Sequence, residues 1–142
     1  MEGTREVSNP PVVLDTNIFY DAGFVRWLKD YRRDKKAPPI VYCELAVKFI
    51  AGDGDTSKLD RLLRGAGVDV SRMLMFHGRQ AAEFAQGARD WKDHWRDYMI
   101  AAHAAHPPTY LVTFNIKDFG CLSGRAVTPP DFQEGIRSGR IH

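Results

Sequence analysis

The sequence Val12-Val13-Leu14-Asp15-Thr16-Asn17-Ile18-Phe19 contains an apolar run that ends in a carboxylate. This run predicts a buried strand at about residues 12–15, with Asp15 at its carboxyl end. Thr16 or Asn17 can cap the helix that we expect to follow. Because ligands bind at the carboxyl edge of an open parallel sheet, Asp15 is the first candidate for a functional residue.

Two later apolar runs also lead into acidic or amide side chains. The strand expected at residues 40–42 leads into Glu44, and the strand expected at residues 110–113 leads into Asn115 and Asp118. The carboxyl ends of parallel strands lie along one edge of the sheet, so these side chains should meet the first acid there.

Strand-like and helix-like segments alternate along the rest of the chain. The sequence predicts helices at about residues 18–34, 44–52, 57–64, 78–86 and 90–105, with Gly23 as a possible interruption of the first. It also predicts a short strand within residues 68–76, with 73–76 favoured, and another at residues 126–127. Proline pairs at residues 38–39 and 107–108 separate a helix from the strand after it. The alternation predicts an α/β fold, a three-layer α/β/α sandwich with a central parallel sheet.

Length and composition indicate one globular domain. A chain of 142 residues with 44% hydrophobic content can bury one core. We expect the domain over residues 12–128, a flexible arm over residues 1–11 and a C-terminal tail over residues 129–142. No apolar run approaches the roughly 20 residues of a membrane helix, and the start lacks the apolar core of a signal peptide, so we expect a cytoplasmic protein without a membrane partner. The two cysteines are too few for a disulfide framework.

A fourth candidate acid lies on the helix expected at residues 90–105. Asp97 is followed at helical spacings of three, four and seven by Ile100, Ala101 and Ala104, which turns its side chain toward the sheet. A carboxylate that points inward is costly without a partner.

Carboxylates that meet at one edge repel one another unless a cation neutralises them. Histidine and cysteine are absent at ligand spacing among these candidates, and oxygen ligands favour Mg²⁺ or Mn²⁺ over zinc. A hard cation that keeps bound waters can activate water and stabilise a leaving oxygen. The pattern therefore predicts metal-dependent hydrolysis of a phosphodiester.

Four short motifs carry a resemblance to a known family. They are Leu14-Asp15-Thr16-Asn17, Tyr42-Cys43-Glu44-Leu45, Asp97-Tyr98-Met99-Ile100-Ala101-Ala102-His103-Ala104 and Leu111-Val112-Thr113-Phe114-Asn115-Ile116-Lys117-Asp118-Phe119. In this order the chain resembles the PIN-domain nucleases, and in particular the VapC-type toxins of type II toxin–antitoxin systems.

The resemblance implies a metal-dependent endoribonuclease, a hydrolase that cuts RNA with Mg²⁺ or Mn²⁺. Asp15, Glu44 and Asp97 match the metal-binding acids of the family. Asp118 is expected to supply the fourth acid, and Asn115 is the alternative through its amide oxygen. The resemblance also implies a homodimer and a cognate antitoxin whose tail enters the acidic groove.

Polar positions around these acids match the family as well. Thr16, Asn17 and Thr113 would orient the carboxylates or the attacking water.

Each candidate also has a structural interpretation. Asp15 and Asp118 could cap helices, Glu44 could complement a helix dipole, and Asp97 could be solvated. Asp93, one turn before Asp97, is interpreted as solvated, although it could extend the cluster.

The basic and aromatic residues indicate a function less specifically than the acids do. A basic segment could hold an RNA backbone beside the cluster or could be an ordinary solvated face; the candidates are Arg26, Lys29, Arg32 and Arg33. Trp91, Trp95 and Tyr98 follow helical spacing and are interpreted as core or dimer packing rather than base stacking.

Two other functions are compatible with such a fold. One is a PIN-like module that binds RNA or a protein partner without cutting. The other is an α/β phosphatase with Asp15 as nucleophile, but that chemistry usually needs a second acid two residues later, where this chain has Asn17.

Overall fold

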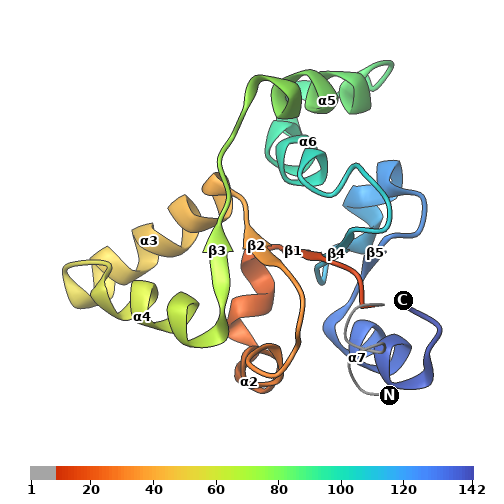
Figure 1. Ribbon diagram of the computed structural model, residues 1–142. Coiled ribbons are helices and arrows are strands. Elements are labelled where there is room, and N and C mark those ends of the chain that lie inside the picture. The colour runs from red at the N-terminus through yellow and green to blue at the C-terminus, as the bar shows by residue number, and fades with distance from the viewer. Residues whose placement is uncertain (1–8) are drawn as a thin grey trace.

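A five-stranded parallel sheet organises the structure, a computed structural model that describes residues 9–142 (Figure 1). The strands are β1 (Val12–Leu14), β2 (Lys35–Ala37), β3 (Val68–Val70), β4 (Tyr110–Val112) and β5 (Ala126–Val127). Their order is β3-β2-β1-β4-β5, and every neighbouring pair is parallel. β1 is therefore the central strand, and its side chains are buried. Helices flank the sheet in the expected three-layer α/β/α arrangement.

Helices fill the connections between the strands. They are η1 (Thr16–Tyr20), α2 (Ala22–Leu28), α3 (Pro39–Asp53), α4 (Ser57–Ala66), α5 (Met75–Ala85), η2 (Trp91–Asp93), α6 (Trp95–Ala102), η3 (Ile116–Leu122) and α7 (Pro129–Ser138), of which the three η segments are 3₁₀ helices. Among the residues described, no helix has the length and apolar character needed to cross a membrane. Since all strands are parallel, the segments that follow them begin at one edge of the sheet.

The second strand lies earlier than the apolar pattern predicted. Residues 40–42 belong to α3, and the strand is formed instead by Lys35–Ala37. Pro39 occupies the first turn of α3, where its fixed φ and missing N–H favour a helix start. Lysine is seldom buried in a strand, yet Lys35 is buried here and its Nζ donates to the carbonyl of Leu28. Glu44 consequently lies in the second turn of α3 rather than at a strand end.

The third strand also lies earlier in the sequence than the favoured residues 73–76. Residues 73–76, expected as a strand, form the approach to α5 and its first turn, and Met75 is 82% exposed. The strand is Val68–Val70, which pairs with β2. Gly67, with φ +71°, ends α4, so the chain enters the sheet at the next residue.

Two of the predicted helices are interrupted. The first divides into η1 and α2 and ends at Leu28, and the second divides into η2 and α6. The caps are not Thr16 or Asn17: the Asp15 side chain accepts the N–H of Thr16, and the Asp21 side chain accepts the N–H of Phe24 at 3.1 Å.

The C-terminal segment is part of the core rather than a loose tail. α7 begins after Thr128, whose hydroxyl accepts the N–H of Asp131 at 3.3 Å. Phe132 is fully buried, and its ring packs against those of Trp27 and Tyr31 with centroids 5.9 and 5.4 Å apart. The expected arm over residues 1–11 falls mostly outside the described residues.

Phe132→Ala is expected to lower the free energy of unfolding by about 3–5 kcal/mol, because it leaves a cavity in this aromatic cluster. Urea denaturation measures the effect. Glu134→Ala, exposed on the same helix, should change stability by less than about 0.5 kcal/mol. Equal stability of the two variants would contradict the packing of α7 in the core.

Candidate active site

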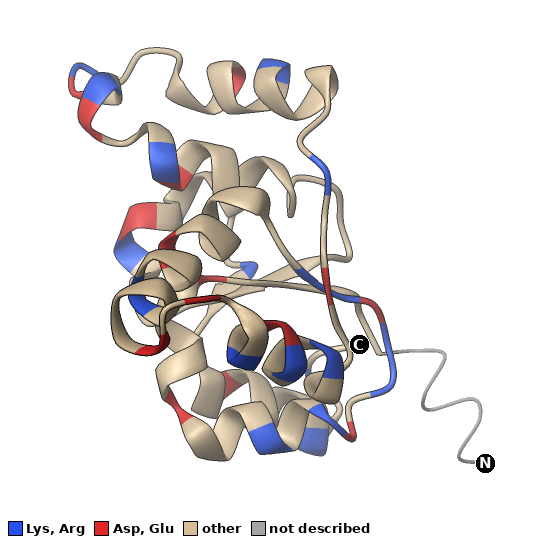
Figure 2. Cartoon of the chain, turned by 90° about the vertical axis from the view of Figure 1, so that its left-hand side faces the viewer, with Lys and Arg blue, Asp and Glu red and all other residues tan. Residues whose placement is uncertain are grey.

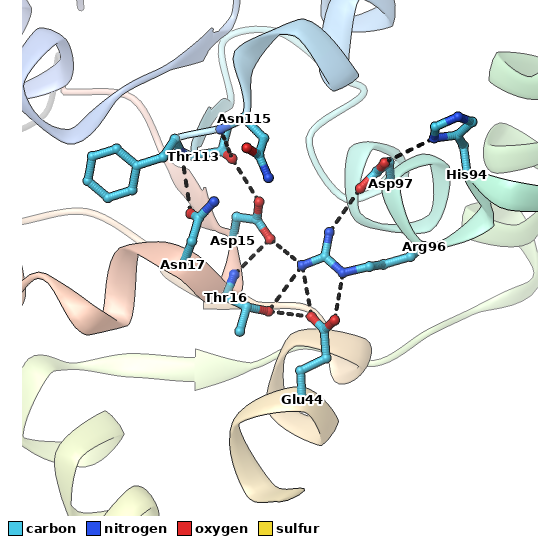
Figure 3. Close-up of polar contacts among 10 residues, drawn as sticks. Asp15, Thr16, Asn17, Glu44, His94, Arg96, Asp97, Thr113 and Asn115 are labelled. Carbon is cyan, nitrogen blue, oxygen red and sulfur yellow. Dashed lines mark hydrogen bonds and ion pairs between the residues drawn. The ribbon is translucent and has the colours of Figure 1, made fainter. Parts of the chain in front are cut away.

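Asp15 is the buried centre of the site. It directly follows β1, and its side chain is 0% exposed. Its Oδ1 accepts the backbone N–H of Thr16 and its Oδ2 accepts the hydroxyl of Thr113, both at 2.7 Å (Figure 3). These donors come from the ends of two adjacent strands, β1 and β4, and they fix both carboxylate oxygens.

Arg96 links the acids, and the sequence analysis did not identify it as a site residue. Its guanidinium lies between Asp15, Glu44 and Asp97 (Figure 3). Nη2 lies 2.8 Å from Asp15 Oδ1, Nε lies 2.7 Å from Glu44 Oε2, and Nη1 lies 2.9 Å from Asp97 Oδ1. Nη2 also donates to Glu44 Oε1 at 2.8 Å. One side chain therefore joins carboxylates from β1, α3 and α6.

Glu44 reaches the site from α3 and is held by two donors. The hydroxyl of Thr16 donates to its Oε1, and Arg96 contacts both of its oxygens. Partial burial alone would raise the pKa of Glu44, but the hydrogen bonds and charge of Arg96, together with the Thr16 hydrogen bond, lower it overall. Glu44 is therefore held in its charged form.

Asp97 lies in the first turn of α6 and points toward the sheet edge, as its spacing predicted. Burial raises its pKa, and the charge of Asp118 acts in the same direction, against the opposing effect of Arg96. His94 Nδ1 lies 3.6 Å from the second carboxylate oxygen of Asp97. Ionisation of Asp97 is therefore less favourable than ionisation of Glu44, relative to the ordinary pKa of each group.

Asp118 and Asn115 both follow β4. Asp118 lies in the first turn of η3, close enough to Asp97 for its charge to affect that residue's pKa. Asn115 is the N-cap residue of η3, and its backbone N–H donates to the Thr113 hydroxyl at 3.0 Å. Asp118 therefore contributes charge to the cluster, whereas the observed contact of Asn115 is through its backbone.

The three polar positions differ in what they contact. Thr16 and Thr113 bond directly to the carboxylates. Asn17 does not: its Oδ1 accepts the backbone N–H of Phe114 at 3.3 Å and so joins η1 to the segment after β4. Asn17 supports the backbone around the site.

The basic segment lies away from the carboxylates. Arg32 and Arg33 precede β2 and are therefore at the amino edge of the sheet, whereas the acids are at the carboxyl edge. Arg26 and Lys29 line a groove of about 380 Å³ between α2 and α4 together with Lys58 and Arg61. Figure 2 shows how basic and acidic residues are distributed along the chain. The segment therefore lies away from the cluster, which favours its interpretation as a solvated face.

The aromatic residues near α6 contact one another. Trp95 packs edge-to-face on Trp91 and Tyr98, with centroids 5.2 and 6.4 Å apart, and all three are partly buried. Asp93 is exposed, in agreement with its interpretation as a solvated acid.

The three carboxylates of Asp15, Glu44 and Asp97 suit a hard divalent ion, but the guanidinium of Arg96 lies between them. Within residues 9–142, no group of three acidic, histidine or cysteine side chains is arranged to hold a metal ion as the site stands. The three carboxylates are nevertheless all within hydrogen-bond distance of one cationic group. In kind and number these oxygens fit Mg²⁺ or Mn²⁺, provided that Arg96 turns away.

The comparisons with known proteins concern the fold. No family model matches the chain, and no curated protein matches it. Among solved structures, the chain is similar to a chain of a toxin–antitoxin complex from Klebsiella pneumoniae, with a TM-score of 0.64 and 20% sequence identity. The similarity covers 83% of this chain and 97% of that chain. At this identity it establishes a shared fold.

Proposed function

We propose that this chain is a metal-dependent endoribonuclease that hydrolyses RNA phosphodiester bonds. The observation that supports the proposal is the convergence of Asp15, Glu44 and Asp97, from three separate elements, at the carboxyl edge of a parallel sheet. Convergent carboxylates are costly unless they bind a cation, and such clusters suit phosphoryl chemistry.

In this proposal Asp15, Glu44 and Asp97 would hold Mg²⁺ or Mn²⁺, with Asp118 or Asn115 as the fourth candidate. The chemistry that such an ion supplies is activation of water and stabilisation of the leaving oxygen. The chain itself orients the carboxylates: Thr113 and the Thr16 N–H fix Asp15, and the Thr16 hydroxyl fixes Glu44.

We further propose that the nuclease is a PIN-type toxin with a cognate antitoxin as partner, and that it forms a homodimer. The similar chain of known structure comes from a toxin–antitoxin complex, which supports this role. The four sequence motifs that resemble those of VapC-type toxins also support it.

The proposal is tested with purified protein and single-stranded RNA. Cleavage is expected in Mg²⁺ or Mn²⁺, loss of cleavage is expected in excess chelator, and restored divalent ion should restore activity, because the carboxylates alone provide no electrophile. Cleavage that persists without any divalent ion would contradict the mechanism.

The position of Arg96 favours one alternative, a PIN-like module that binds RNA or a protein partner without cutting. A guanidinium bound to all three acids could be a permanent substitute for the ion. Retention of RNA without cleavage under every metal condition would support this alternative.

A further inference from the structure

We propose that Arg96 is an internal counter-ion that occupies the metal position and competes with a divalent ion for the three carboxylates. The inference rests on the proposed metal site and concerns how that site is loaded. Arg96 is on this account a positioning residue: it holds the carboxylates together in the metal-free protein and must turn out before an ion binds.

The contacts show direct competition for the same oxygens. Nε, Nη1 and Nη2 of Arg96 each bond to a carboxylate, at 2.7 to 2.9 Å. The Asp15 oxygen engaged by Arg96 is Oδ1, which also accepts the Thr16 N–H, whereas Oδ2 is directed to Thr113. An ion bound by Asp15, Glu44 and Asp97 would therefore meet the guanidinium.

The charge balance favours exchange. Three carboxylates contact the guanidinium of Arg96, and one further positive charge, that of Lys48, acts on Glu44, so the cluster remains negative while Arg96 is bound. Asp118 adds a further negative charge near Asp97. A divalent ion compensates this excess better than a guanidinium does, because its charge is larger and more compact.

The surroundings allow the exchange without dismantling the site. The Arg96 side chain is 32% exposed, so it has a route to solvent, whereas the Asp15 side chain is 0% exposed. When Arg96 leaves, Asp15 keeps its bonds to Thr16 and Thr113, and Glu44 keeps its bond to the Thr16 hydroxyl. Asp15 and Glu44 would therefore remain in place for the ion, and Asp97 would keep its contact with His94 Nδ1 at 3.6 Å.

A competing side chain lowers the apparent affinity for the ion, because only the fraction of molecules with Arg96 turned out can bind. Arg96→Met removes the whole guanidinium and its charge and keeps an unbranched apolar side chain. We expect the variant to bind Mn²⁺ at least about tenfold more tightly than the parental chain in isothermal titration calorimetry. Arg137→Met is the matched control, because Arg137 is exposed on α7 and pairs with Glu134. The Mn²⁺ affinity of this variant should equal that of the parental chain.

A second measurement uses the parental chain and does not depend on folding of the variant. The Nε–H resonance of Arg96, assigned by through-bond NMR experiments on the parental chain, is followed by ¹H–¹⁵N NMR. Added Mg²⁺ should shift this resonance or broaden it by exchange with solvent, because Nε loses its bond to Glu44.

The outcomes separate this inference from the proposed function. Equal Mn²⁺ affinity of the parental and Arg96→Met chains, or Mg²⁺ saturation with an unchanged Arg96 resonance, would overturn the competition while the metal site stands. Failure of both chains to bind Mn²⁺ would overturn the metal site and the inference together.

Discussion

Asp97→Asn is expected to reduce Mg²⁺-dependent RNA cleavage at least about a hundredfold while the protein stays folded. Asp97 supplies one of the three carboxylates, and an amide keeps the shape of the side chain but removes its charge. The pKa of Asp97 is already raised by burial, so loss of this charge should cost little stability. Initial rates on a labelled single-stranded RNA at saturating Mg²⁺ measure the effect.

Asp93→Asn is the matched control for this prediction. Asp93 lies one turn earlier and is exposed, so the same chemical change there should leave the cleavage rate unaltered. Circular dichroism and thermal unfolding of both variants establish that they are folded. A folded Asp97→Asn protein that cuts at the parental rate would remove Asp97 from the mechanism.

The sequence predicted the fold class and the meeting of the acids at one sheet edge because both depend on local patterns. The apolar run of β1 ends at Asp15, and the spacing of Ile100 and Ala101 turns Asp97 inward, as found. Exact strand positions were less predictable. Apolar residues 40–42 begin a helix because Pro39 favours a helix start, and the real strand contains two lysines, of which Lys35 is buried against a backbone carbonyl.

The contacts of Arg96 could not be predicted from the sequence, because they join residues up to 81 positions apart. Nonetheless, one feature of the sequence pointed to Arg96. Converging carboxylates require a cation, and Arg96 is the basic residue directly next to an inward-pointing acid. The acids were interpreted as requiring a metal ion, whereas the structure shows that the side chain of Arg96 supplies positive charge among them.

Asp15→Asn is expected to destabilise the metal-free protein by about 3 kcal/mol. Asp15 is fully buried and accepts three hydrogen bonds, from Thr16, Thr113 and Arg96. An asparagine amide has only one acceptor oxygen, so one of the two acceptors of Asp15 would be replaced by an NH₂ donor and the surrounding hydrogen bonds would have to rearrange. The ion pair with Arg96 would also be lost. Urea denaturation in chelator measures the change, and Asp118→Asn, partly exposed, should cost less than about 1 kcal/mol.

Arg96→Met combined with Asp15→Asn separates the ion pair from the other bonds of Asp15. If the pair contributes to stability, the double variant should be more stable than the sum of the two single effects predicts, because the second substitution no longer leaves a charge without its partner. Strict additivity would mean that Arg96 does not stabilise the metal-free cluster through Asp15. An Asp15→Asn chain as stable as the parental one would show that Asp15 tolerates the loss of its charge, against the contacts that surround it.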